Sequence, residues 1–375
     1  MSETLDLTIE LVKRPSISPD DAGCQEIIIA RLEKLGFKIE RLNFGKTSNL
    51  WATHGEGKPL FAFVGHTDVV PTGPLEQWDS PPFEPEIRDG VLYGRGVADM
   101  KCGVAAFVTA VERFLGKGSN HKGTLAILLT SDEEADASDG TIKVVEHLTS
   151  QGVKIDFCLV GEPSSSATIG DTVKNGRRGS LHFLLKVKGQ QGHVAYPEKA
   201  LNPVHKALGA LNELASKVWD NGNAYFPPTS FQISNIHAGT GADNVIPGEM
   251  DVVSNFRFST EQTAEGLQEA TEAILEKHGL NYDAKFRLSG QPFLTDGGQL
   301  LDAVVTTIKE TVGLDTKLST AGGTSDGRLI APTGAEVVEL GVINASIHKL
   351  NEHADVRQMD ILSDMFEMIT EKILC

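Results

Sequence analysis

Short apolar runs and amphipathic helical segments alternate through the first part of the chain. The apolar runs are bounded by Gly, Asp and Pro, which is typical of buried strands. The helical segments repeat apolar positions at helical spacing, as at Ile27, Ile28, Leu32 and Leu35, and Gly36 follows them as a candidate C-cap. This alternation predicts an α/β sheet. We expect strands within 59–68, 90–99, 123–134 and 156–163, and helices within 4–16, 21–36, 101–116 and 141–152.

The pattern changes after about residue 178. The elements from there to residue 290 follow in the order β-α-β-β-α-β, which is that of a ferredoxin-like unit. Beyond Pro292 the α/β pattern resumes, with two further helices and a strand around a glycine-rich turn. We therefore expect an α+β domain at 179–292, inserted into a catalytic α/β domain made of 1–178 and 293–375.

Composition excludes several functional classes. The 34 Lys and Arg against 51 Asp and Glu give a charge of −17, which argues against binding to nucleic acid or an anionic membrane. No apolar run approaches the ~20 residues needed to span a bilayer. The N-terminal segment is acidic and amphipathic, unlike a secretory signal, so we expect a cytoplasmic protein. The four cysteines are far apart, which indicates neither a disulfide framework nor a thiolate zinc site.

Acidic and imidazole side chains follow the predicted strands at their carboxyl ends. In open α/β sheets the ligand crevice lies at these ends, so groups that are distant in sequence can converge there. His66 and Asp68 are separated by one residue, so their side chains share a face in extended geometry. The candidates are His66, Asp68, Asp99, Glu133, Glu134, Glu162 and His348.

This set of residue types suits a catalytic metal site. Imidazole and carboxylate ligands without a thiolate favour Zn²⁺ or a similar ion in an open site. Because carboxylates outnumber histidines, one aspartate can bridge two ions, and Asp99, just before a predicted helix, is the natural bridge. Of the pair Glu133 and Glu134, one can bind metal while the other takes a proton from the attacking water. Each residue alone also has a structural interpretation, as a hydrogen-bonded histidine, a surface turn or an N-cap; their joint placement favours the metal site.

Several motifs extend this interpretation to a family. Together they resemble, across essentially the whole chain, the dinuclear-zinc amidohydrolase and aminopeptidase family. The resemblance implies a mixed-sheet, zinc-peptidase-like α/β catalytic domain with an inserted ferredoxin-like dimerisation domain. One departure is Ala135, where many members carry Gly, and it puts only the local loop shape in doubt. The motifs are GHTDVVP, LYGRGVADMKCG, TSDEEADASDGT, VGEP, GGTSDGRLIAPTGAEVVELG and IHKLNEH.

The resemblance also implies roles for the candidates. Two Zn²⁺ ions would be bound per subunit, with Co²⁺ able to substitute. The peptide bond after the bridging aspartate, here Asp99-Met100, is commonly cis in the family. The implied roles are His66 and Glu162 on one ion, Glu134 and His348 on the other, Asp99 as the bridge, Asp68 as acceptor of a hydrogen bond from His66, and Glu133 as the general base.

The implied reaction is hydrolysis of the amide bond of N-succinyl-L,L-2,6-diaminopimelate to succinate and L,L-diaminopimelate, in bacterial lysine and peptidoglycan-precursor biosynthesis. His193 resembles a family histidine that stabilises the oxyanion, often in the partner subunit, so a homodimer is expected. The substrate carries three carboxylates, for which Arg177, Arg178, Arg257 and Arg328 are candidate partners. The residues that resemble family substrate contacts are Arg177, Tyr196, Asn244, Arg257, Thr324 and Asn344.

Alternatives remain open at this point. An acetylornithine deacetylase or a related aminoacylase would use the same metal centre. A catalytically silent metal-binding homologue would be free to lose Glu133, which is present. A protein that served only for dimerisation through the inserted unit would leave the strand-end carboxylates unexplained.

Overall fold

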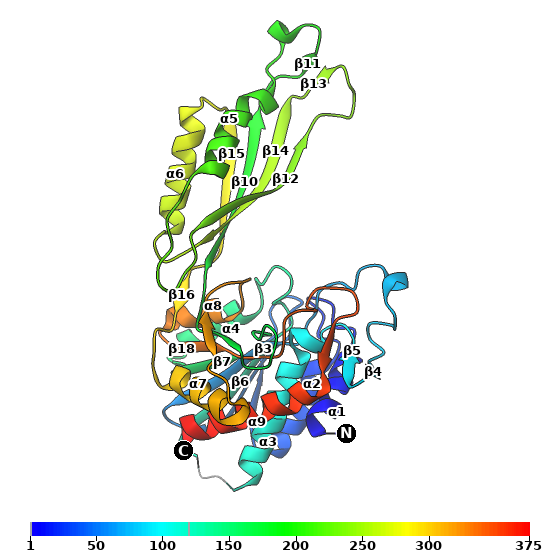
Figure 1. Ribbon diagram of the computed structural model, residues 1–375, viewed down its shortest axis with the longest axis vertical. Coiled ribbons are helices and arrows are strands. Elements are labelled where there is room, and N and C mark those ends of the chain that lie inside the picture. Colours follow the sequence, from blue (N-terminus) through cyan, green and yellow to red (C-terminus); the bar gives the residue numbers. More distant parts are fainter. Residues whose placement is uncertain (1, 119–120) are drawn as a thin grey trace. The chain divides into compact units, whose positions relative to one another are not determined.

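The computed structural model describes residues 2–118 and 121–375 and divides the chain into two compact units (Figure 1). The first unit comprises Met1–Gly176, Leu294–Ser319 and Ser325–Cys375, and the second comprises Arg177–Phe293 and Thr320–Thr324. The segment Thr320–Thr324, predicted to belong to the catalytic domain, groups with the second unit. Within the second unit, Thr320 Oγ1 donates a hydrogen bond to the carbonyl of Tyr225 at 2.6 Å.

A mixed sheet forms the centre of the first unit. Its central strands, β3 (Leu60–His66) and β6 (Gly123–Thr130), are buried at every position, as expected for strands covered on both faces. They run parallel to each other and to β7 (Phe157–Val160), and β18 (Glu336–Glu339) continues the parallel part. Over the described residues the order is β1-β2-β6-β3-β7-β18-β8-β17, in which the remaining strands are β1 (Lys38–Arg41), β2 (Asn49–Glu56), β8 (Thr172–Lys174) and β17 (Lys317–Ser319).

Helices pack on this sheet through a continuous apolar cluster. The longest, α9, packs against α3 and α7, and α3 also contacts α1. Local sequence sets the helix ends: the Ser2 and Asp355 side chains accept backbone N–H groups at the starts of α1 and α9, and Gly36, with φ of 84°, follows α2 as predicted. The helices are α1 (Glu3–Val12), α2 (Cys24–Lys34), α3 (Cys102–Gly116), α4 (Thr141–Ser150), α7 (Gln299–Val312), α8 (Gly327–Ile330) and α9 (Val356–Leu374).

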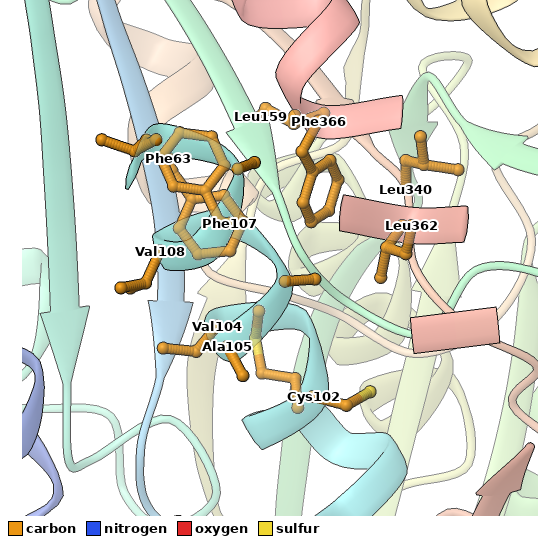
Figure 2. Close-up of a cluster of buried hydrophobic side chains, with 14 of the residues drawn as sticks. Phe63, Cys102, Val104, Ala105, Phe107, Val108, Leu159, Leu340, Leu362 and Phe366 are labelled. Carbon is orange, nitrogen blue, oxygen red and sulfur yellow. The ribbon is translucent and has the colours of Figure 1, made fainter. Parts of the chain in front are cut away.

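Three aromatic rings join the sheet to α3 and α9 in this cluster (Figure 2). The ring of Phe107 stacks on that of Phe63, with centroids 4.2 Å apart, and meets the ring of Phe366 edge-on at 5.8 Å. All three side chains are fully buried. Such offset and edge contacts add to the stabilisation from burial alone.

Truncation of Phe107 is therefore expected to weaken the whole first unit. We predict that Phe107→Ala lowers the free energy of unfolding by about 3–5 kcal/mol, because it removes buried contacts and leaves a cavity between sheet and helices. Urea denaturation followed by circular dichroism measures this change. Leu75→Ala, at a side chain that is 63% exposed, serves as the control and should change stability by less than about 0.5 kcal/mol. Equal losses in the two variants would contradict the prediction.

Residues Arg177–Phe293 are described without a gap, and the central part of this segment forms a second sheet with its own core. The strands lie in the order β12-β14-β10-β15, and all neighbours are antiparallel. Taken in chain order this is the ferredoxin-like arrangement that the sequence predicted. Both helices lie on one face of the sheet (Figure 1). The elements are β10 (Gly179–Lys188), α5 (Pro203–Ser216), β12 (Ser230–Ala238), β14 (Glu249–Phe258), α6 (Ala264–Lys277) and β15 (Tyr282–Gly290).

Smaller elements complete the structure. A three-stranded sheet in the first unit has the order β19-β5-β4, and short strands pair elsewhere as β11 with β13 and β9 with β16. In the part of the chain that the structure describes, no helix combines the length and apolar character needed to cross a membrane. The strands are β4 (Glu86–Arg88), β5 (Val91–Tyr93), β9 (Gly176–Arg177), β11 (Gly192–His193), β13 (Val245–Ile246), β16 (Phe293–Leu294) and β19 (His353–Asp355), and short helical turns lie at Leu75–Gln77, Val97–Lys101, Pro197–Lys199 and Ala331–Thr333.

Candidate metal centre

Three parallel strands bring predicted site residues to one edge of the main sheet. His66 is the last residue of β3, Glu133 and Glu134 follow β6, and Glu162 follows β7. Because β3 lies between β6 and β7, the carboxyl ends of these strands are neighbours. The strand-end prediction therefore holds for these four residues.

Two candidates, Asp99 and His348, lie on loops. The prediction that they directly follow strands of the main sheet is wrong. Asp99 lies in the turn Val97–Lys101, since the run at 90–99 forms only the short strand β5 of the separate three-stranded sheet. Gly94 and Gly96, with φ of 158° and 82°, turn the chain away from β5 before Asp99. His348 lies in the loop between β18 and β19 and has φ of 58°. The Asp99-Met100 peptide bond is cis, as the family resemblance implied.

Asp99 lies between the two histidines. Its Oδ1 is 3.3 Å from His66 Nε2, and its Oδ2 is 3.2 Å from His348 Nε2. Glu162 Oε1 lies 3.5 Å from His66 Nε2, and Glu134 Oε1 lies 3.0 Å from His348 Nε2. Each oxygen of Asp99 thus faces one histidine, and each histidine has one glutamate beside it. Such an arrangement suits a carboxylate shared by two cations.

Potential ligand atoms are close enough to share a cation. Among the residues described, two groups of three have ligand atoms within 4.8 Å of one another. One comprises His66, Glu133 and Glu162, and the other comprises His66, Asp99 and Glu134. Most of these side chains are buried, whereas His348 is 51% exposed, which leaves access from solvent on its side.

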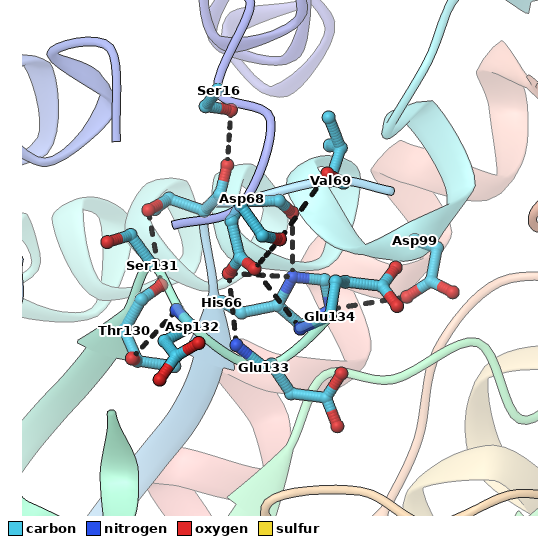
Figure 3. A network of polar contacts seen from close by, with 12 residues as sticks. Ser16, His66, Asp68, Val69, Asp99, Thr130, Ser131, Asp132, Glu133 and Glu134 are labelled. Carbon is cyan, nitrogen blue, oxygen red and sulfur yellow. Dashed lines mark hydrogen bonds and ion pairs between the residues drawn. The ribbon is translucent and has the colours of Figure 1, made fainter. Parts of the chain in front are cut away.

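Asp68 organises the strand ends around His66 (Figure 3). Contrary to the role that the family resemblance implied, His66 Nδ1 donates to the Asp68 main-chain carbonyl at 2.9 Å, and Oδ1 of the Asp68 carboxylate lies 3.6 Å away. The carboxylate is occupied by other donors, because it accepts the Ser18 hydroxyl and the N–H of Glu134, the latter at 3.1 Å. Since Nδ1 carries the donated proton, Nε2 is the ring nitrogen available to a metal.

The charges at the site are incompletely balanced. Burial raises the pKa of Glu162, and the neighbouring Asp99 raises it further, to about 8. Hydrogen bonds with Asp99 and Glu134 raise the pKa of His348 to about 10. Burial lowers the pKa of His66, but hydrogen bonds with Asp99 and Glu162 outweigh this and hold it well above its usual value. The carboxylates thus favour positive charge at this site.

Glu133 has different surroundings from Glu134, the other glutamate of the pair. Burial raises its pKa well above the usual value, and the charges of Glu162 and Asp326 add to the shift. Arg328 Nη1 lies 3.6 Å from Glu133 Oε1 and 3.9 Å from Asp326 Oδ1. Asp326 was not among the predicted site residues, although it lies within the glycine-rich GGTSDGR segment.

The predicted substrate residues fall into both units. Asn344 lies in the first unit, where its N–H donates to the carbonyl of Ser165 at 3.0 Å. Arg328, a candidate partner for a substrate carboxylate, also lies in the first unit, and Arg178 lies in the second. The other residues that resemble family contacts belong to the second unit. His193 pairs with Val245 across β11 and β13, and its ring centroid is 5.7 Å from that of Tyr196. The members in the second unit are Arg177, His193, Tyr196, Asn244, Arg257 and Thr324.

Local contacts join some of these residues within the second unit. Val194, next to His193, donates its N–H to the carbonyl of Asn244 at 3.1 Å. Arg177 Nη1 contacts the carbonyl of Gly323, beside Thr324, at 3.3 Å. Arg257 lies on β14 opposite Ser180.

Fold and site together define a metal-dependent hydrolase. The model of peptidase family M20/M25/M40 matches residues 62–372, and the chain belongs to this family. Curated relatives agree along the full length. A succinyl-diaminopimelate desuccinylase of Thioalkalivibrio sulfidiphilus is 60% identical over 374 residues, covering 100% of both chains. One of Acinetobacter baumannii is 60% identical over 373 residues, covering 100% of this chain and 99% of the relative.

Solved structures share the fold. An M20 family metallo-carboxypeptidase from Sulfolobus solfataricus superposes with a TM-score of 0.84 at 18% identity, covering 100% of this chain and 99% of the other. A dinuclear metal-binding peptidase of the M20 family from Bacillus subtilis gives 0.72 at 18% identity, covering 98% and 96%. At this identity the likeness concerns the fold alone. It confirms the predicted mixed-sheet α/β class.

Proposed function

We propose that the chain hydrolyses the amide bond of N-succinyl-L,L-2,6-diaminopimelate to succinate and L,L-diaminopimelate, a step of bacterial lysine and peptidoglycan-precursor biosynthesis. The observation that carries the proposal is the full-length identity of 60% to desuccinylases, in a chain whose site carboxylates and histidines converge as described. Hydrolysis in H₂¹⁸O tests the reaction: one labelled oxygen is expected in succinate and none in diaminopimelate. Label in the diaminopimelate, or no cleavage, would overturn it.

The proposed ligands fit two divalent cations. His66 and Glu162 would hold one, Glu134 and His348 the other, and Asp99 would bridge them. The donor set contains only imidazole and carboxylate groups, and its unbalanced negative charge favours cations. When bound, the ions would polarise the succinyl carbonyl and stabilise the negative charge that develops on its oxygen. We propose Zn²⁺ as the metal, with Co²⁺ able to substitute.

Glu133 would serve as the general base. It is the glutamate of the pair not needed to hold the second ion, and burial raises its pKa, which favours uptake of a proton. It would take a proton from the attacking water as the new C–O bond forms. It would then pass that proton to the amine nitrogen as the C–N bond breaks. Asp68 would fix the position of Glu133 and of Glu134 through their backbone N–H groups.

The second unit would supply residues for substrate recognition. Arginine guanidinium groups bind carboxylates through two parallel hydrogen bonds, so Arg177 and Arg257 would hold carboxylates of the substrate. His193 would stabilise the oxyanion. Tyr196, Asn244 and Thr324 are further proposed contacts from this unit, and Asn344 is one from the first unit.

Arg257→Lys is expected to lower kcat/KM for the succinyl substrate by about 10- to 100-fold, because lysine keeps the charge but loses the paired donors of the guanidinium group. Steady-state kinetics measure this change. Arg357→Lys, at a side chain on α9 that is 86% exposed, should leave kcat/KM unchanged. An Arg257→Lys variant with wild-type kcat/KM would remove Arg257 from the proposed substrate contacts.

We further propose that the second unit mediates a homodimer and that the protein is cytoplasmic. The ferredoxin-like sheet has the edge strand β12, on which Ile236 is 52% exposed, and such an edge can pair with a second copy. Sedimentation at working concentration should give twice the chain mass of 40.3 kDa. A species of single-chain mass alone would overturn the dimer.

A further inference from the structure

A buried ion pair contacts the segments that carry the candidate metal ligands and contains none of these ligands. Arg95 Nη1 donates to Glu352 Oε2 at 2.8 Å, and the side chains are only 2% and 1% exposed. The guanidinium carbon Cζ of Arg95 lies over the ring of Trp78, 5.2 Å from the ring centroid. Taking two charges out of water is costly, so a pair buried to this degree must make further polar contacts.

The Glu352 carboxylate makes these contacts with the turn that carries Asp99. Its Oε1 accepts the N–H groups of Ala98 at 3.0 Å and of Asp99 at 3.1 Å. Its Oε2 accepts the N–H of Gly96 at 3.0 Å in addition to Arg95. Three backbone donors in four residues are thus fixed by one side chain, and the last belongs to Asp99 itself.

The Arg95 guanidinium reaches two other segments of the site. Its Nη1 contacts the carbonyl of Lys349, the residue after His348, at 3.2 Å. Its Nη2 contacts the carbonyl of Pro71 at 3.3 Å, in the segment that follows His66 and Asp68. Arg95 and Glu352 therefore join the turn of Asp99, the loop of His348 and the chain beyond β3. Asp99 and His348 are the two site residues that no strand of the main sheet positions.

We infer that Arg95 and Glu352 are positioning residues that set the relative placement of Asp99 and His348, and with it the affinity for the second metal ion. The inference rests on the metal centre of the proposed function. Residues behind metal ligands typically change metal affinity or activity by about 10- to 100-fold when they are replaced. Asp99 and His348 lie on loops. The buried pair therefore positions them, as the main sheet positions His66 and Glu162.

The test compares metal binding by Glu352→Gln and Arg95→Lys with that of the wild-type chain. A glutamine amide presents its NH₂ to backbone donors that need an acceptor, and a lysine at position 95 has a single ammonium in place of the forked guanidinium. Zn²⁺ dissociation constants are measured by competition with a chromophoric chelator, and Co²⁺ absorption spectra report the ligand geometry. Glu112→Gln is the matched control, because it removes the carboxylate of another Arg–Glu pair of the first unit, Arg31–Glu112 at 2.8 Å.

We expect the dissociation constant of the more weakly bound ion to rise about 10- to 100-fold in both variants, with a changed Co²⁺ spectrum and restoration of activity by excess metal. Glu112→Gln should bind both ions as the wild type does. Variants that fold by circular dichroism and bind both ions within twofold of wild type would overturn the inference. If only one of the two variants folds, its metal affinity decides whether the inference holds. If neither folds, the ion pair is needed for folding and the inference fails. A wild-type chain that binds no divalent ion would overturn the proposed centre itself.

Discussion

Replacing Glu133 by glutamine is expected to lower kcat for the succinyl substrate by about 10²- to 10⁴-fold, the usual contribution of a general base. Glutamine keeps the size of the side chain but cannot take up the proton of the attacking water. The ions should stay bound, since the proposed ligands are unchanged. The assay therefore pairs steady-state kinetics with metal analysis of the same sample.

The metal content distinguishes two roles for Glu133. Its carboxylate lies within 4.8 Å of ligand atoms of His66 and Glu162, so it is also placed to bind an ion. Loss of one ion in Glu133→Gln would make Glu133 a ligand instead of the base. Glu33→Gln, at an exposed position on α2, is the matched control and should retain both full activity and full metal content.

The second large effect is expected for Asp99→Asn. The two carboxylate oxygens of Asp99 face different histidines, at 3.3 and 3.2 Å, and asparagine replaces one of these oxygens by an NH₂ group that cannot bind a cation. We predict that the bound metal falls from two ions to one per chain. Loss of an ion that contributes several kcal/mol to the transition state should lower kcat by about 10³-fold or more.

Metal analysis after dialysis and kinetics at saturating substrate measure the two consequences of Asp99→Asn. Asp6→Asn, at an exposed position on α1, is the control for the same chemical change elsewhere in the first unit. An Asp99→Asn variant that keeps two ions and wild-type kcat would show that Asp99 does not bridge them.

The sequence predicted most of the architecture because local signals agreed with the tertiary structure. The continuous apolar runs of β3 and β6 mark strands buried on both faces, and the helical spacing in α2 ends at Gly36, whose positive φ closes the helix. Strands β1 and β2 escaped prediction. The former is four residues long and partly exposed, so it lacks a pattern of its own and forms by pairing with β2.

The site was predictable where strands carry it and less so where loops do. His66, Glu133, Glu134 and Glu162 follow apolar runs, and the sheet order places them together. The contacts of the Asp68 carboxylate could not be predicted, because they depend on Ser18 and on backbone N–H groups brought in by folding. To predict where these donors lie, the structure of the loops would have to be known. The same holds for Asp326, Arg95 and Glu352, which lie within or beside recognised motifs but act through contacts that are distant in sequence.

Substrate choice is the most direct test of the proposed function. The measurement is kcat/KM of the zinc-loaded chain for N-succinyl-L,L-diaminopimelate and, under the same conditions, for N-acetylornithine. We predict rapid hydrolysis of the succinyl substrate and little or none of the acetyl substrate, with both rates abolished by a chelator and restored by Zn²⁺. Preferential hydrolysis of N-acetylornithine, or no hydrolysis of either substrate by the metal-loaded chain, would contradict the account.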